Sequence, residues 1–291
     1  MSQPLRKSKT LGVALKILVA LAALAWVFTQ INVQEVVKVF SGANLMLLAL
    51  AFVLFTLSKV TSSFRLNIFF RNHEIHISEK ENLKLYWLGM FYNIFLPGGV
   101  SGDGYKIYLL KKKLNRNLKE LFTAVLIDRL SGVVALASFA GILLAFSLQQ
   151  DPLLKHSWVL AFLVPAGFFL FFRLFFKRYQ TIYLPVTLYS FLVQGLQAVA
   201  VFFILKSFGI SEDQTSYIFV FLISSIVAII PISIGGAGTR ELAFYYGAQY
   251  LSLSPEISIA ISLTFYLITL ITSLAGIIFS FKTPDIDRKA L

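Results

Sequence analysis

The sequence predicts an all-α, polytopic membrane protein with about six spanning helices and two re-entrant hairpins arranged as an inverted repeat. First, 57% of the 291 residues are hydrophobic and 14% are charged, whereas soluble domains carry about 25% charged residues. Second, several apolar runs approach or exceed the roughly 18 residues needed to cross a bilayer. Third, two glycine-rich breaks interrupt apolar sequence in matching patterns. We therefore expect residues 1–291 to form a single integral membrane domain.

The apolar runs define the six expected spanning helices. The first run follows Arg6, Lys7 and Lys9 as a signal peptide would, but it has no convincing cleavage site, so we interpret it as a retained helix. The chain has no cysteine, which excludes disulfides, thiolate metal sites and cysteine nucleophiles. The six helices are expected at 11–29, 43–64, 118–148, 157–176, 184–207 and 255–281.

The two breaks share the pattern Pro-x4-Gly-x-Gly-x-[Lys/Arg]. They read Pro97-Gly-Gly-Val-Ser-Gly-Asp-Gly-Tyr-Lys106 and Pro231-Ile-Ser-Ile-Gly-Gly-Ala-Gly-Thr-Arg240. Each follows an apolar run that is too short to cross comfortably and precedes a second short helical run. The simplest geometry is a re-entrant hairpin, and paired interruptions of this kind point to a transport site near the bilayer midplane. The four short runs are 85–96, 105–110, 217–230 and 240–251.

The distribution of basic residues predicts the orientation. Most of the 26 lysines and arginines fall in segments that six spans and two hairpins place on one side, which identifies that side as cytoplasmic. The net charge of +12 therefore indicates cytoplasmic loops, with some attraction to anionic lipids, and not nucleic acid. We expect the cytoplasmic (inner) membrane, with both termini inside. The expected cytoplasmic segments are the N-terminus, 65–84, 106–119, 173–183 and 282–291.

The number of expected spans relates the two halves of the chain. Residues 1–150 and 151–291 would each contribute three spans and one hairpin. Because three is odd, the second half must be inverted relative to the first. The hairpins then enter the membrane from opposite faces.

The breaks and two charged residues in a predicted span supply the candidate substrate-binding residues. In the first break we expect glycines with positive φ or close backbone approach, followed by a helix beginning near Tyr105 whose free N–H groups face a polar headgroup. In the second break Thr239 is a plausible N-cap. For the first break the alternative is a tight turn whose glycines serve only helix packing. For the second break the alternative is that Arg240 and Glu241 only neutralise the local backbone and each other. The candidates are Asn93, Pro97, Gly99, Gly102, Asp103, Lys106, Asp128, Arg129, Pro231, Ser233, Gly236, Gly238, Arg240 and Glu241.

Asp128 and Arg129 lie deep in a predicted span, about 12–17 Å from its start. A charge there costs about 2.5–3.5 kcal/mol, so such residues usually face a cavity or a partner. We expect Asp103 to pair with Arg129, and Arg240 or Lys106 to pair with Asp128; structural pairing alone stays open as their role.

Three further polar residues receive simpler interpretations. We expect Lys59 to snorkel to the membrane surface. We expect Arg65 to reflect orientation, with contact to lipid headgroups as the alternative. Asn93 is expected to hydrogen-bond the first break.

Other chemistries lack their motifs. His73-Glu-Ile-His76 does not have the zinc-protease spacing, and no phosphate-binding loop or serine nucleophile elbow is present. We therefore expect no metal, no cofactor and no catalytic residue.

The stretches Asn93–Lys106, Asp128-Arg129 and Pro231–Glu241 resemble the lysylphosphatidylglycerol synthase transmembrane-domain family. That family includes the flippase part of the multiple peptide resistance factor and stand-alone UPF0104-like proteins, and the resemblance covers about residues 60–281. It implies a membrane protein that moves a lipid between leaflets, with both breaks in a central cavity. The family more often has arginine at Lys106 and glutamate at Asp128. Because lysine lacks the bidentate fork of arginine, this departure weakens the expectation of two-point phosphate recognition.

The leading hypothesis is a flippase or transporter for a phospholipid or lipid-linked headgroup, not an enzyme. No aminoacyltransferase domain follows the membrane region up to Leu291, so synthesis of lysyl-lipid is not expected. The alternatives are a membrane-embedded enzyme, or an enzyme partner, acting on lipid or polyprenyl-phosphate substrates, and a lipid-ordering scaffold. The expected partners are membrane lipids with anionic or zwitterionic headgroups; a homo-oligomer or a lipid-synthesising enzyme stays open.

Overall fold

The computed structural model describes residue 18 and residues 21–95, 100–148, 151–230, 236–281, 284 and 286. Within these ranges the regular structure is helical, with no strand. Five helices are long and apolar enough to cross a membrane, which confirms the predicted class: Leu45–Asn72, Leu118–Ser147, Leu154–Phe175, Lys177–Ser207 and Pro255–Phe281. The predicted first span is described only in part, as the helix Leu21–Gln30.

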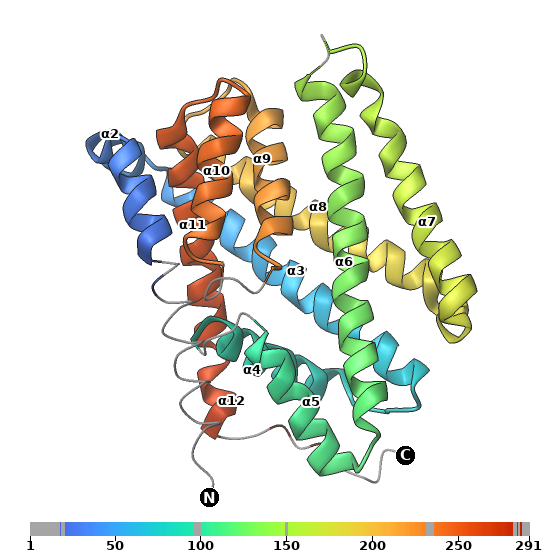
Figure 1. The fold of residues 1–291 in the computed structure, drawn as a ribbon. Helices are drawn as coiled ribbons and strands as arrows, with labels where there is room; N and C mark the ends of the chain where they lie inside the picture. Colours follow the sequence, from blue (N-terminus) through green and yellow to red (C-terminus); the bar gives the residue numbers. More distant parts are fainter. Residues whose placement is uncertain are drawn as a thin grey trace, which may run out of the picture.

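Three long helices form the frame of the molecule (Figure 1). They are α3 (Leu45–Asn72), α6 (Leu118–Ser147) and α8 (Tyr183–Ser207). The three pack against one another, and α3 and α8 share an extensive contact. Each long helix carries buried apolar residues near both of its ends, and these residues belong to two separate hydrophobic cores.

The first core surrounds the pair α4 (Glu79–Phe95) and α5 (Ser101–Leu114). It also includes buried residues of α7 (Leu160–Phe175) and the 3₁₀ helix η2 (Lys177–Ile182). Figure 1 shows α4 and α5 at the lower end of the molecule, where the N-terminal part of α6 joins them.

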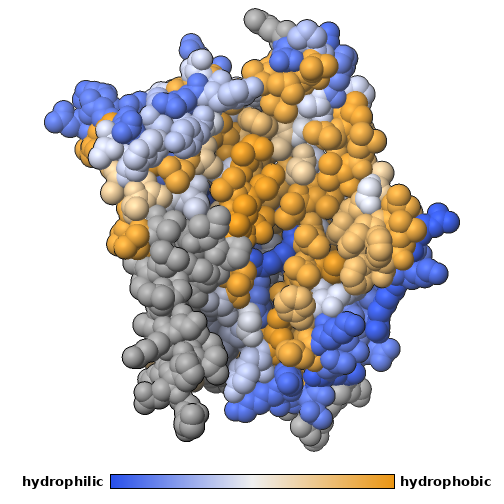
Figure 2. Space-filling model, viewed as in Figure 1, coloured by the Kyte–Doolittle hydropathy of each residue, from blue (hydrophilic) through white to orange (hydrophobic). Residues whose placement is uncertain are grey.

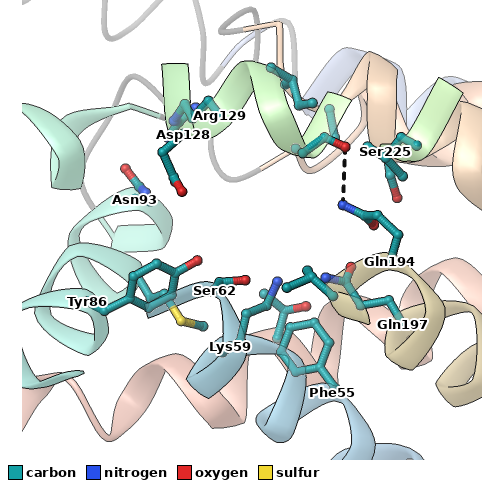
Figure 3. Close-up of a pocket in the computed structure, with 18 of the residues that line it drawn as sticks. Phe55, Lys59, Ser62, Tyr86, Asn93, Asp128, Arg129, Gln194, Gln197 and Ser225 are labelled. Atoms are coloured by element: carbon teal, nitrogen blue, oxygen red, sulfur yellow. Dashed lines mark hydrogen bonds between the residues drawn. The ribbon is translucent and has the colours of Figure 1, made fainter. Parts of the chain in front are cut away.

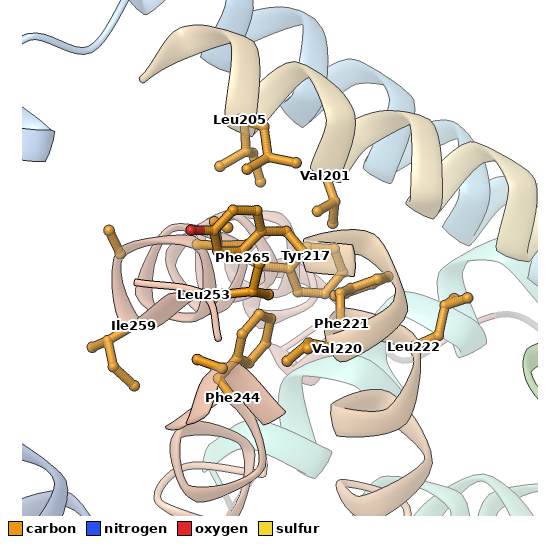
Figure 4. Packing of buried hydrophobic residues seen from close by; sticks show 14 of the residues in the cluster. Val201, Leu205, Tyr217, Val220, Phe221, Leu222, Phe244, Leu253, Ile259 and Phe265 are labelled. Carbon is orange, nitrogen blue, oxygen red and sulfur yellow. The ribbon is translucent and has the colours of Figure 1, made fainter. Parts of the chain in front are cut away.

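The second core surrounds the pair α9 (Gln214–Val227) and α10 (Thr239–Tyr250). Residues from α2 (Val33–Ser41), α8 and α11 (Pro255–Leu274) complete it, and Figure 4 shows Phe221, Phe244 and Phe265 packed together there. In Figure 1 the α9–α10 pair lies at the upper end. The two short helix pairs thus occupy opposite ends of the molecule.

Several helix boundaries differ from those expected. Helix α3 continues eight residues past the predicted end at 64, because the residues after Arg65 remain largely apolar and are buried in the first core. Helix α4 begins at Glu79 and not at 85: Ser78 Oγ accepts a hydrogen bond from the Glu81 N–H, and two glutamates in the first turn suit the helix dipole. The cytoplasmic loop expected over 65–84 is therefore mostly helical.

The expected single helix over 255–281 is interrupted. Helix α11 ends at Leu274, and a short helix, α12 (Ile277–Phe281), follows. Gly276 lies at the interruption, where an added Cβ would stand 2.3 Å from the Trp87 carbonyl oxygen. Trp87 also donates from Nε1 to the Thr272 carbonyl at 3.0 Å. The bend therefore lets α4 pack closely against the end of the last span.

The outer surface fits a bilayer. Figure 2 shows hydrophobic residues over the middle of the visible face and hydrophilic residues toward its ends. Helix α7 is the clearest lipid-facing element, because only Phe168 and Phe172 are buried along it while residues such as Phe162 and Phe175 are exposed. Figure 2 also shows a small hydrophilic area deep between the hydrophobic side chains.

The imidazole of His73, just beyond the end of α3, gives a testable pH dependence. Its Nε2 lies 2.6 Å from the Tyr179 hydroxyl, and burial, followed by the nearby Arg178 guanidinium, lowers the pKa of His73 below its usual value. In the unfolded chain His73 takes up a proton near pH 6.5, whereas the folded protein takes it up only at lower pH. The contribution of His73 to stability is therefore fully present above pH 6.5 and is lost as the pH falls below it. We expect the unfolding temperature of the wild type to fall more between pH 7.5 and pH 5.5 than that of His73→Gln. The maximum slope from this group is about 1.4 kcal/mol per pH unit; equal pH dependence in the two proteins would contradict the assignment.

Candidate functional site

A cavity of about 310 Å³ lies between the two hydrophobic cores. Side chains from α3, α4, α5, α6, α8, α9, α10 and α11 line it, and Figure 3 shows polar groups converging on it from several of these helices. On α6 the lining residues Asp128 and Gly132 follow Ile127 of the first core and precede Leu136 of the second. The three long helices therefore place their middle sections around this space, which we call the central cavity.

The central cavity carries an excess of positive charge. Its described lining contains five basic and two acidic side chains. Charges in a membrane interior are costly and usually face a cavity or a partner, so this concentration makes the cavity the candidate functional site. The charged lining residues are Lys59, Arg65, Asp103, Lys106, Asp128, Arg129 and Arg240.

Asp103 joins two of these cations. It is the third residue of α5, where a carboxylate suits the helix dipole. Lys106 Nζ donates to Asp103 Oδ1 at 2.9 Å, and Arg129 Nε of α6 donates to Oδ2. The expected Asp103–Arg129 pair is thus present. Lys106 Nζ also lies 4.5 Å from the centre of the Tyr86 ring, so this lysine is held by an anion and an aromatic face.

Asp128 has a partner that the sequence did not indicate. Arg65 Nε donates to Asp128 Oδ1 at 2.8 Å, and Arg65 also donates to Ser190 Oγ at 3.0 Å. Both side chains of the pair are at least nine-tenths buried, at 6% and 9% exposed. The expectation that Arg240 or Lys106 pairs with Asp128 was wrong. Arg65 is buried and paired, a contact that orientation alone does not explain. Arg65 and Lys106, counted among the cytoplasmic charges, are both buried.

Around the first break, Asn93 and Gly102 connect α4 to α5. The Gly102 N–H donates to Asn93 Oδ1 at 2.8 Å, as expected for Asn93. Gly102 is helical, and an added Cβ would stand 1.8 Å from the Gly89 carbonyl oxygen. Helix α5 begins at Ser101 and not near Tyr105, so Gly102 serves close helix packing and not a loop conformation.

In the described part of the second break, residues 236–240, the backbone takes the conformation expected of glycine. Gly236 and Gly238 have φ of 85° and 82°, which side chains rarely tolerate. Gly238 is the N-cap of α10, so the assignment of Thr239 as N-cap was wrong. Glu241, only 2% exposed, accepts from the Gly238 N–H at 2.7 Å and from Ser262 Oγ at 2.8 Å. It fixes the start of α10 and lies outside the cavity lining.

Lys106 and Arg240 reach the central cavity from different positions in their helices. Helix α5 begins at Ser101 and helix α10 at Thr239, so Lys106 is its sixth residue and Arg240 its second. The two breaks match in sequence, but α5 starts four residues after the proline of its motif and α10 starts eight residues after the proline of its own. Both cations still line the same cavity.

Lys59 and Arg240 form a second cationic group on the wall beside Phe55 and Phe265. Lys59 Nζ lies 4.5 Å from the Phe55 ring centre, and Arg240 Cζ lies 5.0 Å from the Phe265 ring centre. The two rings meet edge to face at 5.1 Å. Neither cation has an ion-pair partner among the residues that the structure describes. The expectation that Lys59 snorkels to the surface was therefore wrong, because it faces the cavity (Figure 3).

The predicted site residues divide into three groups. Gly102, Gly238 and Glu241 shape the helices around the cavity without lining it. Pro97, Gly99, Pro231 and Ser233 lie outside the described residues. Those that line the central cavity are Asn93, Asp103, Lys106, Asp128, Arg129, Gly236 and Arg240.

The sequence reasoning missed polar lining residues on five helices, α3, α4, α8, α9 and α11. On α3 a signal was available: Phe55, Lys59, Ser62 and Arg65 recur at helical spacing within an arc of about 120°. On α8, Gln194 and Gln197 are three residues apart in an otherwise apolar span and both are buried. The missed polar lining residues are Lys59, Ser62, Arg65, Tyr86, Gln194, Gln197, Ser225 and Thr269.

The described part of the chain contains no group of three or more histidine, aspartate or glutamate residues that could hold a metal ion. His73 instead contacts Tyr179, and His76 is exposed.

The fold and the cavity define a polytopic helical membrane protein whose charged groups face an internal space. The chain belongs to the family described as the lysylphosphatidylglycerol synthase TM region, whose model matches residues 13–184 and 174–276. The chain is also similar to the UPF0104 membrane protein PH1989 of Pyrococcus horikoshii. The two are 23% identical over 288 residues, which covers 80% of this chain and 85% of that protein. No solved structure matches.

Proposed function

We propose that this protein moves a lipid with an anionic headgroup across the cytoplasmic membrane through the central cavity. The observation that carries the proposal is the excess of basic over acidic side chains around a cavity inside an apolar helical frame. Positive charge without a counter-charge is unfavourable inside a membrane protein. A bound anion would lower that energetic cost. The family name, which refers to a synthase of a phosphate-bearing lipid, agrees with such a substrate.

The size of the cavity fits a headgroup and not a whole lipid. At about 310 Å³ it lies at the lower end of small-ligand pockets. The hydrocarbon chains would remain outside, against exposed apolar side chains such as those of α7. Only the headgroup then needs a polar path. The cavity would supply this path and so lower the cost of moving a polar group through the hydrocarbon core.

The arrangement of the short helix pairs supports passage from one side to the other. The α4–α5 and α9–α10 pairs belong mainly to different cores at opposite ends of the molecule (Figure 1). We propose that they are re-entrant hairpins entering from opposite faces, with both termini in the cytoplasm. The two halves of the chain would then give the headgroup access from each side in turn.

A lipid-translocation assay in liposomes tests the proposal. The full chain is reconstituted with a headgroup-labelled anionic phospholipid, and loss of the label's accessibility to an external quencher is followed over time. We expect the wild type to accelerate translocation and Arg129→Ala and Arg240→Ala each to slow it at least about tenfold, the value of one charge-assisted hydrogen bond. Arg173→Ala, at an exposed position of α7, is the control. Wild-type rates in both cavity variants would refute the site, and no acceleration by the wild type would refute the function.

An enzyme acting on the same lipid is the main alternative. Incubation of the purified protein with anionic phospholipids, followed by mass spectrometry, distinguishes the two. Transport leaves every lipid mass unchanged, whereas lipid modification or cleavage produces a new one.

A further inference from the structure

We propose that Lys59 and Arg240 form the subsite that binds the phosphate of the lipid headgroup, with Gln194 and Ser225 beside it. This inference rests on the proposed function and assigns one part of the cavity to one chemical group. Neither the family match nor the relative's name assigns a role to Lys59.

The five cations of the central cavity differ in whether they have an ion-pair partner. Lys106 and Arg129 share the carboxylate of Asp103, and Arg65 is paired with Asp128. The remaining two, Lys59 and Arg240, have no ion-pair partner among the residues that the structure describes. Two of the three excess positive charges of the cavity therefore lie at these two residues, and the third lies where Lys106 and Arg129 share Asp103.

Lys59 and Arg240 are unfavourably placed without an anion. Lys59 and Arg240 lie over the touching rings of Phe55 and Phe265, which places two like charges on one stretch of wall. The aromatic faces offset part of the cost, but a cation–π contact contributes only about 0.5–2 kcal/mol. An anion between the two cations would remove their repulsion and supply acceptors to both.

Several buried side-chain polar atoms have no hydrogen bond in the described structure. Three of them belong to residues that line the central cavity: Arg240 Nε, Ser225 Oγ and Gln194 Oε1. Figure 3 shows Lys59, Gln194 and Ser225 around the open space. Arg240 Nε is a donor and the serine hydroxyl can donate, so both suit phosphate oxygens. Gln194 Oε1 is an acceptor, which suits a hydroxyl on the same headgroup.

Phosphate is the anion that best matches this set. A lipid phosphate presents several acceptor oxygens, and it can meet a guanidinium, an ammonium and a hydroxyl at once. The planar fork of Arg240 gives directional contacts and Lys59 adds a mobile point charge. The same chemistry could come from a free phosphate ester in water, so the experiment includes both sources.

The experiment measures binding to the purified full chain in detergent. The lipid probe is phosphatidylglycerol, the zwitterionic comparison is phosphatidylcholine, and the water-soluble source is glycerol 1-phosphate. Dissociation constants are obtained from native mass spectrometry for the lipids and from calorimetry for glycerol 1-phosphate. The variants are Lys59→Gln, Arg240→Gln and the charge-retaining Lys59→Arg, and Lys111→Gln at an exposed position of α5 is the matched control. Unfolding curves, followed through the three tryptophans, confirm that each variant is folded.

We expect each glutamine variant to bind phosphatidylglycerol at least about tenfold more weakly, as the loss of a charge-assisted hydrogen bond requires. Lys59→Arg should remain close to the wild type, and Lys111→Gln should equal it. Unchanged affinity in folded Lys59→Gln and Arg240→Gln would overturn the subsite. Equal affinities of the wild type for phosphatidylglycerol and phosphatidylcholine would overturn the anionic headgroup of the proposed function and sustain the phosphate subsite, because both lipids carry a phosphate. If glycerol 1-phosphate bound as tightly as phosphatidylglycerol, the proposal that the bound phosphate belongs to a lipid would be overturned.

The outcome separates the subsite from the function. Selective binding that depends on both cations, without translocation in liposomes, would sustain the subsite and refute transport. If folded Lys59→Gln and Arg240→Gln kept wild-type binding and wild-type translocation rates, the subsite would be refuted and transport would be sustained.

Discussion

Replacing Asp128 with leucine is expected to destabilise the protein by about 3–5 kcal/mol, the cost of breaking a buried ion pair by removing one partner. The variant leaves the Arg65 guanidinium buried with only Ser190 Oγ among its described hydrogen-bond partners. Arginine does not lose its proton in proteins, so it cannot relieve the cost by becoming neutral. Arg65→Leu should cost less, because the Asp128 carboxylate left behind can take up a proton.

The double variant Arg65→Leu/Asp128→Leu should recover much of the lost stability, because no unpaired charge remains. The measurement is a double-mutant cycle from reversible unfolding in mixed detergent, monitored by tryptophan fluorescence. Arg71 and Glu79 provide the comparison, since they form an ion pair whose side chains are 52% and 40% exposed. The same leucine cycle there should give a coupling of only about 0.2–1 kcal/mol. Additive losses at Arg65 and Asp128 would show that the buried pair has no special role.

Gly102→Ala is expected to separate α4 from α5 and to destabilise the protein by at least about 1–3 kcal/mol, the usual range for overpacking. The added Cβ would stand 1.8 Å from the Gly89 carbonyl oxygen, and backbone cannot move aside as a flexible side chain does. The Asn93–Gly102 hydrogen bond, 2.8 Å long, would be lost with this contact. Translocation should fall as well, because Asp103, the next residue, positions Lys106 and Arg129.

Gly104→Ala is the matched control for this substitution. Gly104 is exposed in the same helix, and an added Cβ there meets nothing within 4 Å. Alanine favours a helix over glycine by about 0.5–1 kcal/mol, so this variant should be equally or more stable than the wild type. Thermal unfolding of both variants in one detergent makes the comparison. Similar stabilities for the two would contradict close packing at Gly102.

The sequence could predict the membrane class and the cavity-lining role of several charged residues, because both depend on strong local signals. A charge such as Asp128 inside a long apolar run has few inexpensive locations other than an internal space. The partner of that charge was not predictable in the same way. Arg65 lies 63 residues away along the chain, and its location depends on how α3 packs against α6.

Lys59 and Arg65 were misjudged because the end of α3 was set too early. A drop in hydropathy at Arg65 resembles the end of a span, but the buried residues Leu66, Phe69 and Phe70 continue the helix. The start of α5 was set too late for a related reason. Glycines in a break favour a loop, yet Gly102 is helical because close packing against Gly89 needs the absence of a side chain.

The path of the three long helices limits how the protein can change shape. Because α3, α6 and α8 are each anchored in both hydrophobic cores, a rocking of one whole half against the other would have to bend or slide all three. The short pairs α4–α5 and α9–α10 are anchored mainly in one core each. A small tilt of one pair would disturb only the packing at its own end. Separate tilts of the two short pairs on a stiff frame would therefore disturb less packing than a rocking of whole halves.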